Sequence, residues 1–370
     1  MIDHPAITHG SDYTTIILAW FDGGLHWFDT PRNHLDMVVI LDAYYLSYAL
    51  GISLAWIFAQ RWQKQGKFKV HSWQVYDLTL ISILGVLLGA KTVYVLFYHL
   101  DYYIEHPEQI ITNWSGMASH GAILGLIAGY WLWSRATKVS LLHIVDNTCI
   151  PAAMGGMFIR AANFLNGELY GRSCDPDLPW AMRFPMRDEV GQWLYADASN
   201  KVYSVVIDQP DGKITQHLEP YTLNEGWMRL TERNPVKIEG QMNVWPVVTD
   251  ARHPSQIYQL ILTGIVLTTV LFMIRKRSTR VGTVTGAFFV GYGITRIIEE
   301  LFRQPDQQLG FVTRYLSDAF GIEMPNLSMG QLLSLGLIAA GLLILRYRAK
   351  HPRLIAELPM PIDPRVQKKG

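Results

Sequence analysis

The chain has 370 residues, of which only 17% are charged, and its formal net charge is +1 at pH 7. A surface that binds nucleic-acid phosphates normally shows a strong basic excess, so this balance argues against nucleic acid as a partner. The two cysteines, Cys149 and Cys174, are too few for a disulfide framework or a zinc site. Lone cysteines are mostly buried fillers rather than nucleophiles.

The first 36 residues are typical of an interfacial segment. No Lys or Arg precedes the first apolar run, which fails the pattern of a signal peptide. That run, residues 14–21, is shorter than the roughly 20 residues that a membrane-spanning helix needs. We expect residues 1–36 to lie at the membrane surface.

Later segments of the chain are apolar and long enough to cross a membrane as helices. There are seven, at residues 37–62, 73–100, 117–134, 141–166, 256–274, 282–302 and 329–347. The sequence therefore predicts an all-α polytopic membrane protein with seven transmembrane helices. Four of them fall in residues 37–172 and three in residues 253–350.

Basic residues follow the first, third, fifth and seventh segments, whereas the loop after the second segment, residues 101–108, is acidic. Positively charged loops stay on the cytoplasmic side of a membrane. We therefore expect the N-terminus outside and the C-terminal tail, residues 351–370, in the cytoplasm.

A polar insert, residues 173–252, separates the fourth and fifth segments and would lie on the extracytoplasmic side. Alternating residues in 201–208 and 213–218 predict two strands, and the Gln-Pro-Asp-Gly sequence between them favours a turn. The insert is expected to form a small β-containing head. It is either a solvent-exposed extension without a role of its own or a surface that binds a partner polypeptide.

Glycines four residues apart mark places where membrane helices approach closely. Such pairs are Gly85 with Gly89 in the second segment, Gly121 with Gly125 in the third and Gly282 with Gly286 in the sixth. We expect these helices to pack through their glycines.

Two arginines lie on small-residue faces of predicted membrane helices. Helical spacing places Arg160 and Asn163 on one face with Gly156, and Arg296 on one stripe with Gly286 and Gly293. We expect these small residues to leave room for a ligand. A charge at membrane depth usually faces a cavity or the bundle interior, and arginine suits bidentate recognition of phosphate. The pattern indicates a site for a phospholipid, in an enzyme or a carrier.

Structural roles remain open for the same residues. Arg160 would pair with Glu168 or Glu300 if it only held helices together. Glu300 and Arg303, near a helix end, would be snorkelling residues. His120, near the outer end of the third segment, would be an ordinary interfacial histidine.

The motifs around these residues resemble those of the prolipoprotein diacylglyceryl transferase family, from about Leu41 to Tyr347. Residues 160–172, RAANFLNGELYGR, resemble the family signature R-x-G-N-F-x-N-G-E. The other matching motifs are Ser119-His120-Gly121, HPSQIY at 253–258, Tyr292-Gly293 with Arg296, RQPD at 303–306 and LSMGQ at 327–331.

The resemblance implies a transferase that moves the diacylglyceryl group of phosphatidylglycerol to the lipobox cysteine thiol of a preprolipoprotein. A thioether forms and glycerol phosphate leaves, in the first step of bacterial lipoprotein maturation. The implied partners are phosphatidylglycerol, the preprolipoprotein signal peptide and membrane lipid, and no metal or other cofactor is implied. The implied location is the bacterial cytoplasmic (inner) membrane. We expect a monomer, because no charged interhelical zipper is evident.

The resemblance also assigns site residues. The implied catalytic residues are His120, Arg160, Arg296 and Tyr44. The implied substrate-binding residues are Asn163, Asn166, Glu168, Gly171, Glu300 and Arg303. Both catalytic arginines would bind the phosphate headgroup, with Tyr44 hydrogen-bonded to it. Glu300 and Arg303 would form a second, ion-paired layer. His120 is the candidate base for the thiol, with lipid positioning or a structural role as the alternative.

The sequence departs from the family pattern at several positions without removing a charge from the implied headgroup site. The departures are Ala43, Lys91, Ala122, Ile159, Ala162 and Gln259. Two other classes of protein stay open: a non-catalytic phospholipid carrier or scramblase-like protein, and a membrane protein whose working part is the head.

Overall fold

The computed structural model describes residues 43–112, 116–165, 167–184, 186, 193–199, 201–207, 214–222, 227–229, 236–238, 242–303 and 328–361. These residues belong to two compact units. Among the described residues, the first unit contains 43–46, Ile159–Leu260 and Ile298–Met329, and the second contains Ser47–Phe158, Ile261–Ile297 and Gly330–Gly370. The predicted interfacial segment, residues 1–36, lies outside the described residues.

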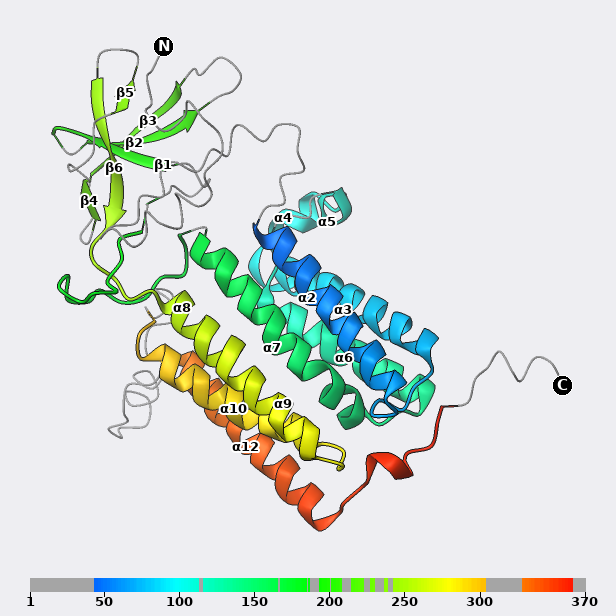
Figure 1. Cartoon of the computed structure of the whole chain (residues 1–370). Coiled ribbons are helices and arrows are strands. Elements are labelled where there is room, and N and C mark those ends of the chain that lie inside the picture. The colour runs from blue at the N-terminus through cyan, green and yellow to red at the C-terminus, as the bar shows by residue number, and fades with distance from the viewer. Residues whose placement is uncertain are drawn as a thin grey trace, which may run out of the picture. The chain divides into compact units, whose positions relative to one another are not determined.

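Long helices dominate the second unit, and some of them continue into the first (Figure 1). They are α2 (Ala43–Lys64), α3 (Ser72–Tyr98), α6 (Ser119–Thr137), α7 (Leu141–Leu165), α9 (Thr268–Arg277), α10 (Thr283–Glu300) and α12 (Met329–Lys350). Each predicted segment overlaps one of these helices, and the fifth segment also includes α8 (Ser255–Gln259) and the π-helix η2 (Leu260–Leu267). The sequence pattern thus identified where these helices lie.

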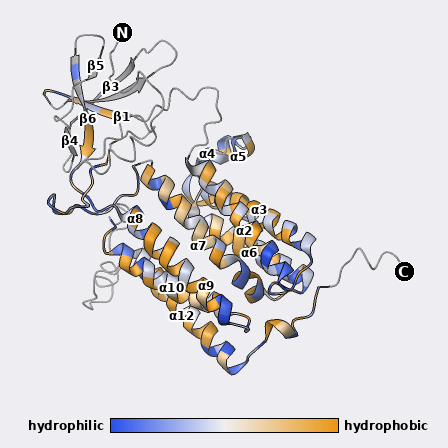
Figure 2. Cartoon of the chain, viewed as in Figure 1, coloured by the Kyte–Doolittle hydropathy of each residue, from blue (hydrophilic) through white to orange (hydrophobic). Residues whose placement is uncertain are grey.

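Three helical stretches among the described residues are long and apolar enough to cross a membrane: Ser72–Tyr98, Ser255–Arg277 and Gly330–Lys350. Figure 2 shows the apolar residues along the helices and the hydrophilic ones near the end of α9. Large apolar side chains on their surfaces are exposed, including Phe97 at 78% and Leu343 at 66%. Water-facing helices rarely expose such surfaces, so these faces suit a lipid environment.

Helices α3 and α6 pack through their glycines, which confirms the expectation from the sequence. A Cβ atom on Gly85 would lie 2.8 Å from the carbonyl oxygen of Gly125, and one on Gly89 would overlap that of Gly121. Only the absence of side chains at these positions allows the two backbones to come so close.

The glycines of α10 are also contact points. This confirms the close helix approach expected at Gly286, and it differs from the prediction that the glycine stripe of this helix leaves room for a ligand. A Cβ on Gly293 would lie 2.7 Å from the carbonyl oxygen of Ser334, and one on Gly286 would lie 3.1 Å from that of Gly341. Both partners belong to α12, so this part of the glycine stripe serves helix packing. Gly156 on α7 does face open space, since nothing lies within 4 Å of the position that a Cβ would take there.

The insert in the first unit contains an antiparallel sheet with the strand order β3-β2-β1-β6-β4, in which β5 pairs with β6. The strands are β1 (Trp193–Asp197), β2 (Lys201–Ile207), β3 (Ile214–Thr222), β4 (Trp227–Arg229), β5 (Val236–Ile238) and β6 (Met242–Thr249). Strands β2 and β3 correspond to the two predicted strand runs, and the Gln-Pro-Asp-Gly turn lies outside the described residues. Leu194, Val202 and Val247 form the small apolar core of this sheet.

Candidate active site

A hydrogen-bonded chain joins three of the predicted site residues at the end of α7. Arg160 Nη1 donates to Asn163 Oδ1 at 2.9 Å, and Asn163 Nδ2 donates to Glu168 Oε1 at 3.4 Å. Asn163 is 3% exposed, whereas Arg160 and Glu168 are half-buried. The bond to Asn163 fixes the direction of the guanidinium fork, which is the group that recognises phosphate bidentately.

The backbone turn at the C-terminus of α7 brings Glu168 within hydrogen-bonding distance of Asn163. The N–H of Gly167 donates to the carbonyl of Phe164, and the N–H of Glu168 donates to the carbonyl of Asn163, both at 3.0 Å. Gly167 has φ of +66°, the left-handed conformation that glycine adopts without a steric cost. This is a Schellman cap, and it reverses the chain directly after the helix.

The loop after this cap is joined to two other segments by backbone hydrogen bonds. The N–H of Gly171 donates to the carbonyl of His253 at 2.8 Å, and the N–H of Arg172 donates to that of Phe302 at 2.8 Å. The side chain of Arg172 donates from Nε to the carbonyl of Arg303 at 2.7 Å. The signature segment, the HPSQIY motif and the end of α10 therefore form one connected structure.

Gly171 has no room for a side chain at this junction. A Cβ atom would lie 2.5 Å from the carbonyl oxygen of Phe302 and 2.6 Å from that of His253, and both obstacles are backbone. The structure therefore gives Gly171 a packing role, and its predicted role in substrate binding stays a prediction.

Gly171→Ala is expected to destabilise the protein by about 1–3 kcal/mol, because an added methyl group must push two backbone segments apart. Thermal unfolding in detergent tests this, with Gly336→Ala as the control. Nothing lies within 4 Å of a Cβ at Gly336, so that variant should unfold near the wild-type temperature. Equal unfolding temperatures for the two variants would contradict the prediction.

The HPSQIY motif holds the loop that carries Glu168. Gln256 Nε2 donates to the carbonyl of Glu168 at 2.6 Å, and Ser255 Oγ donates to that of Leu169 at 3.1 Å. These positioning residues were not predicted, although the motif itself was recognised. His253 shares a hydrogen bond of 3.1 Å with the Tyr258 hydroxyl, and burial lowers the pKa of His253 below its ordinary value.

Glu300 and Arg303 lie at the end of α10. Glu300 is 7% exposed, and its carboxylate accepts a hydrogen bond of 2.9 Å from Ser328 Oγ. Its backbone carbonyl accepts a bond of 3.4 Å from Arg172 Nη2. Glu300 is therefore held within the first unit, and the predicted ion pair with Arg303 stays a prediction.

The remaining predicted site residues are His120, Arg296, Tyr44 and Asn166. His120 is exposed in the first turn of α6, and Arg296 is half-buried on α10, both in the second unit. Tyr44 lies in the first turn of α2, but its side chain is outside the described residues, as is Asn166.

Comparison with known proteins supports the resemblance seen in the motifs. The family model "Prolipoprotein diacylglyceryl transferase" matches residues 34–347. The chain belongs to this family. Among its relatives, a phosphatidylglycerol–prolipoprotein diacylglyceryl transferase of Erwinia tasmaniensis is 34% identical over 328 residues, which cover 86% of this chain and 92% of the relative.

Two further relatives carry the same name. The protein from Ralstonia pickettii is 32% identical, over 86% of this chain and 92% of its own length. The protein from Burkholderia thailandensis is 34% identical, over 86% of this chain and 94% of its own length. All the predicted site residues fall inside the segment that the family model matches.

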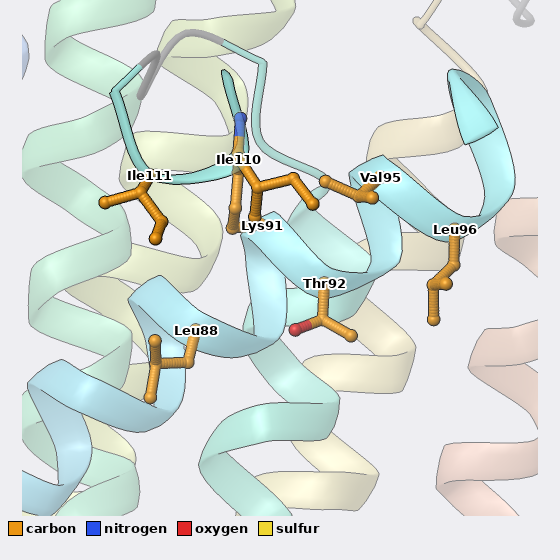
Figure 3. A pocket seen from close by; sticks show the side chains of 7 residues that line it. All are labelled: Leu88, Lys91, Thr92, Val95, Leu96, Ile110 and Ile111. Carbon is orange, nitrogen blue, oxygen red and sulfur yellow. The ribbon is translucent and has the colours of Figure 1, made fainter. Parts of the chain in front are cut away.

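Lys91, one of the departures from the family pattern, is almost fully buried in the second unit. It is 4% exposed, its Nζ donates to the Tyr103 hydroxyl at 2.9 Å, and it lies 4.8 Å from the centre of the Tyr103 ring. Its aliphatic stem lines an apolar pocket of about 360 Å³, where Figure 3 shows it beside Ile110. The ammonium group is thus accommodated by an aromatic partner.

Neither cysteine of this family member suits the role of a nucleophile. Cys149 is buried inside α7 at 3% exposure. Burial raises the pKa of the Cys174 thiol above its ordinary value, and the negative charges of Asp250 and Asp175 raise it further, while Arg252 opposes them. The reactive form of a thiol is the thiolate, so a raised pKa makes Cys174 slow at neutral pH.

Alkylation of Cys174 is expected to be slow near pH 7 and to accelerate about tenfold per pH unit up to its raised pKa, since the rate follows the thiolate fraction. Mass spectrometry after iodoacetamide treatment from pH 7 to 10 measures this rate, with the unfolded protein as the reference. Asp250→Asn should accelerate the reaction at a fixed pH, because it removes a negative charge that raises the pKa. A folded protein that reacts as fast as the unfolded one at pH 7 would contradict the prediction.

Proposed function

We propose that this protein transfers the diacylglyceryl group of phosphatidylglycerol to the cysteine thiol of a prolipoprotein lipobox. The sulfur forms a bond to the glycerol carbon, the bond from that carbon to the phosphate oxygen breaks, and glycerol phosphate leaves with the electron pair. The thiol proton passes to a base. The observation that carries the proposal is family membership across residues 34–347, shared with relatives that bear this enzyme's name.

The leaving phosphate needs cations that stabilise its developing negative charge. We assign this role to Arg160 and Arg296. Support for Arg160 comes from its bond to Asn163 and, through it, from Glu168, because these contacts orient the guanidinium before substrate arrives. Gln256 would act as a positioning residue, since it holds the backbone of Glu168.

The thiol must lose its proton to become a good nucleophile. We assign the base to His120, whose exposed position in the first turn of α6 leaves the imidazole open to a substrate. The alternative role for His120 is positioning of the lipid, and Tyr44 is the further candidate contact to the headgroup.

The finer topology is also proposed. The helices would cross the bacterial inner membrane seven times, with the N-terminus outside and the C-terminus in the cytoplasm, as the basic flanks indicate. The insert with strands β1 to β6 would then be extracytoplasmic, and the protein would act as a monomer.

The proposal is tested by transfer of a labelled diacylglyceryl group from phosphatidylglycerol to a lipobox peptide by the purified protein. Arg296→Ala should abolish most of the transfer, because one of the cations at the phosphate is lost. His120→Asn separates the two roles of the histidine: a base requires a large loss in kcat, whereas a lipid-positioning residue changes mainly KM. If the wild type binds the lipid but never modifies the peptide, the protein is a carrier and the transferase proposal fails.

A further inference from the structure

A second groove of the second unit lies where α9 ends and α10 begins, and it has a volume of about 540 Å³. One wall is apolar and consists of Val270, Met273 and Ile274 of α9. This wall belongs to the apolar stretch Ser255–Arg277, and Met273 is 49% exposed on its surface. The wall therefore offers a lipid-facing surface that suits an acyl chain.

The opposite end of the groove is polar and positively charged. It is lined by Arg277 and Arg280, together with the hydroxyl-bearing residues Ser278, Thr279 and Thr283. Both arginines are exposed, and among the described residues no Asp or Glu forms an ion pair with either of them. Two forked guanidinium groups beside hydroxyl donors form a site that is complementary to phosphate.

The turn that carries the two arginines is held in place by other parts of the second unit. The N–H of Ile355 donates to the carbonyl of Thr279 at 2.8 Å, and the N–H of Val281 donates to that of Arg353 at 2.9 Å. The N–H of Gly282 donates to the Asp146 carboxylate at 2.6 Å. A ligand therefore needs to order little of the backbone when it binds, which favours affinity.

We propose that this groove binds one anionic phospholipid, with its phosphate on Arg277 and Arg280 and an acyl chain along Val270, Met273 and Ile274. Basic pockets at the ends of membrane helices are known to hold anionic headgroups. The site is separate from Arg296, which lies about 20 Å further along α10 at 1.5 Å per residue. In the proposed orientation it draws its lipid from the cytoplasmic leaflet, and it does not depend on the transferase activity.

The proposal is tested by titrating the delipidated full-length protein in detergent with phosphatidylglycerol or phosphatidylcholine and counting bound lipids by native mass spectrometry. The test variant is Arg277→Gln with Arg280→Gln. Its matched control is Lys276→Gln with Arg346→Gln, which removes the same charge from exposed basic residues outside the groove. Because Arg160 and Arg296 can hold phosphatidylglycerol too, both titrations are made in the Arg160→Ala, Arg296→Ala background.

We expect the background protein and the control to bind one phosphatidylglycerol in preference to phosphatidylcholine. The test variant should bind it about thirtyfold more weakly, since each basic residue near an anionic lipid contributes about fivefold. Met273→Trp, which keeps both arginines but fills the apolar wall, should also weaken binding.

Four results would overturn the proposal or a part of it. Equal losses in the test variant and the control would mean that diffuse surface charge holds the lipid. Equal binding of phosphatidylcholine would mean that the arginines do not recognise the negative charge of the lipid. Competition by inorganic phosphate at the same concentration as lipid would indicate a site for the free anion. Unchanged binding by Met273→Trp would exclude the acyl-chain placement.

Discussion

Arg160→Ala is expected to lower the rate of diacylglyceryl transfer by at least about 10²-fold, the typical cost of removing one donor that stabilises a charge in a transition state. The variant loses the cation assigned to the leaving phosphate. It also leaves the Oδ1 atom of Asn163, a residue that is 3% exposed, without the hydrogen bond from Arg160. The labelled-lipid assay measures the rate at saturating phosphatidylglycerol and peptide.

Two companion variants decide what the loss means. Arg160→Lys keeps the charge but not the fork, so its rate should fall between those of the wild type and Arg160→Ala. Arg135→Ala removes an exposed arginine at the end of α6 and should transfer at the wild-type rate. If Arg160→Ala lost stability in proportion to activity, the structural alternative, in which Arg160 only holds its neighbours together, would be the better explanation.

The sequence predicted the positions of the helices well, because an apolar stretch that is long enough to cross a membrane is rarely anything other than a helix. Residues 141–166 were predicted as one helix, and α7 spans Leu141–Leu165. The strand run 201–208 corresponds to β2, because alternation of residue types has a period of two in a strand. Glycine pairs also located the contact between α3 and α6 correctly.

Other features of the fold have no signal in the local sequence that would predict them. The π-helix η2 continues the same apolar run as α8 and α9, so hydropathy alone cannot separate it from an α-helix. The short helix α4 (Leu100–Glu105) lies in the acidic loop and α5 (Gln109–Thr112) follows it, and neither helix was predicted. Small residues on a helix face fit both a cavity and a close helix contact, which is why Gly286 was predicted in both roles and the role of Gly293 was predicted wrongly.

Only the local geometry of the candidate site could be predicted from the sequence, and the roles of its residues stay predictions. Arg160, Asn163 and Glu168 lie within nine residues of sequence, so helical spacing and a cap are enough to bring them together. The bond from Gln256 to Glu168 joins residues that are 88 positions apart, and no periodicity reports such a contact. Long-range positioning residues therefore required the structure.

Asp146→Ala is expected to be the most destabilising single change outside the site, at about 3–5 kcal/mol. The Asp146 carboxylate is 1% exposed and accepts bonds from the N–H of Gly282 at 2.6 Å, the N–H of Thr285 at 2.8 Å and the Thr285 hydroxyl at 2.7 Å. It thus caps the N-terminus of α10 from another helix. Its removal leaves buried donors unsatisfied, each at a cost of about 1–3 kcal/mol.

Asp146→Asn keeps one carbonyl oxygen as an acceptor, so it should lose about half as much stability. Asp101→Ala, which removes an exposed aspartate from α4, is the control and should unfold near the wild-type temperature. Thermal unfolding in detergent gives the comparison. If Asp146→Ala matched the control, the cap would not be needed for folding.

The same substitution should act unequally on the two ends of α10. Asp146 holds Gly282, which belongs to the turn that carries Arg277 and Arg280, whereas Arg296 lies about 20 Å away along the helix axis. We therefore expect the folded fraction of Asp146→Ala to retain transfer of the labelled lipid but to bind phosphatidylglycerol more weakly at the groove. Loss of both in a fully folded sample would mean that the helix transmits the change along its length.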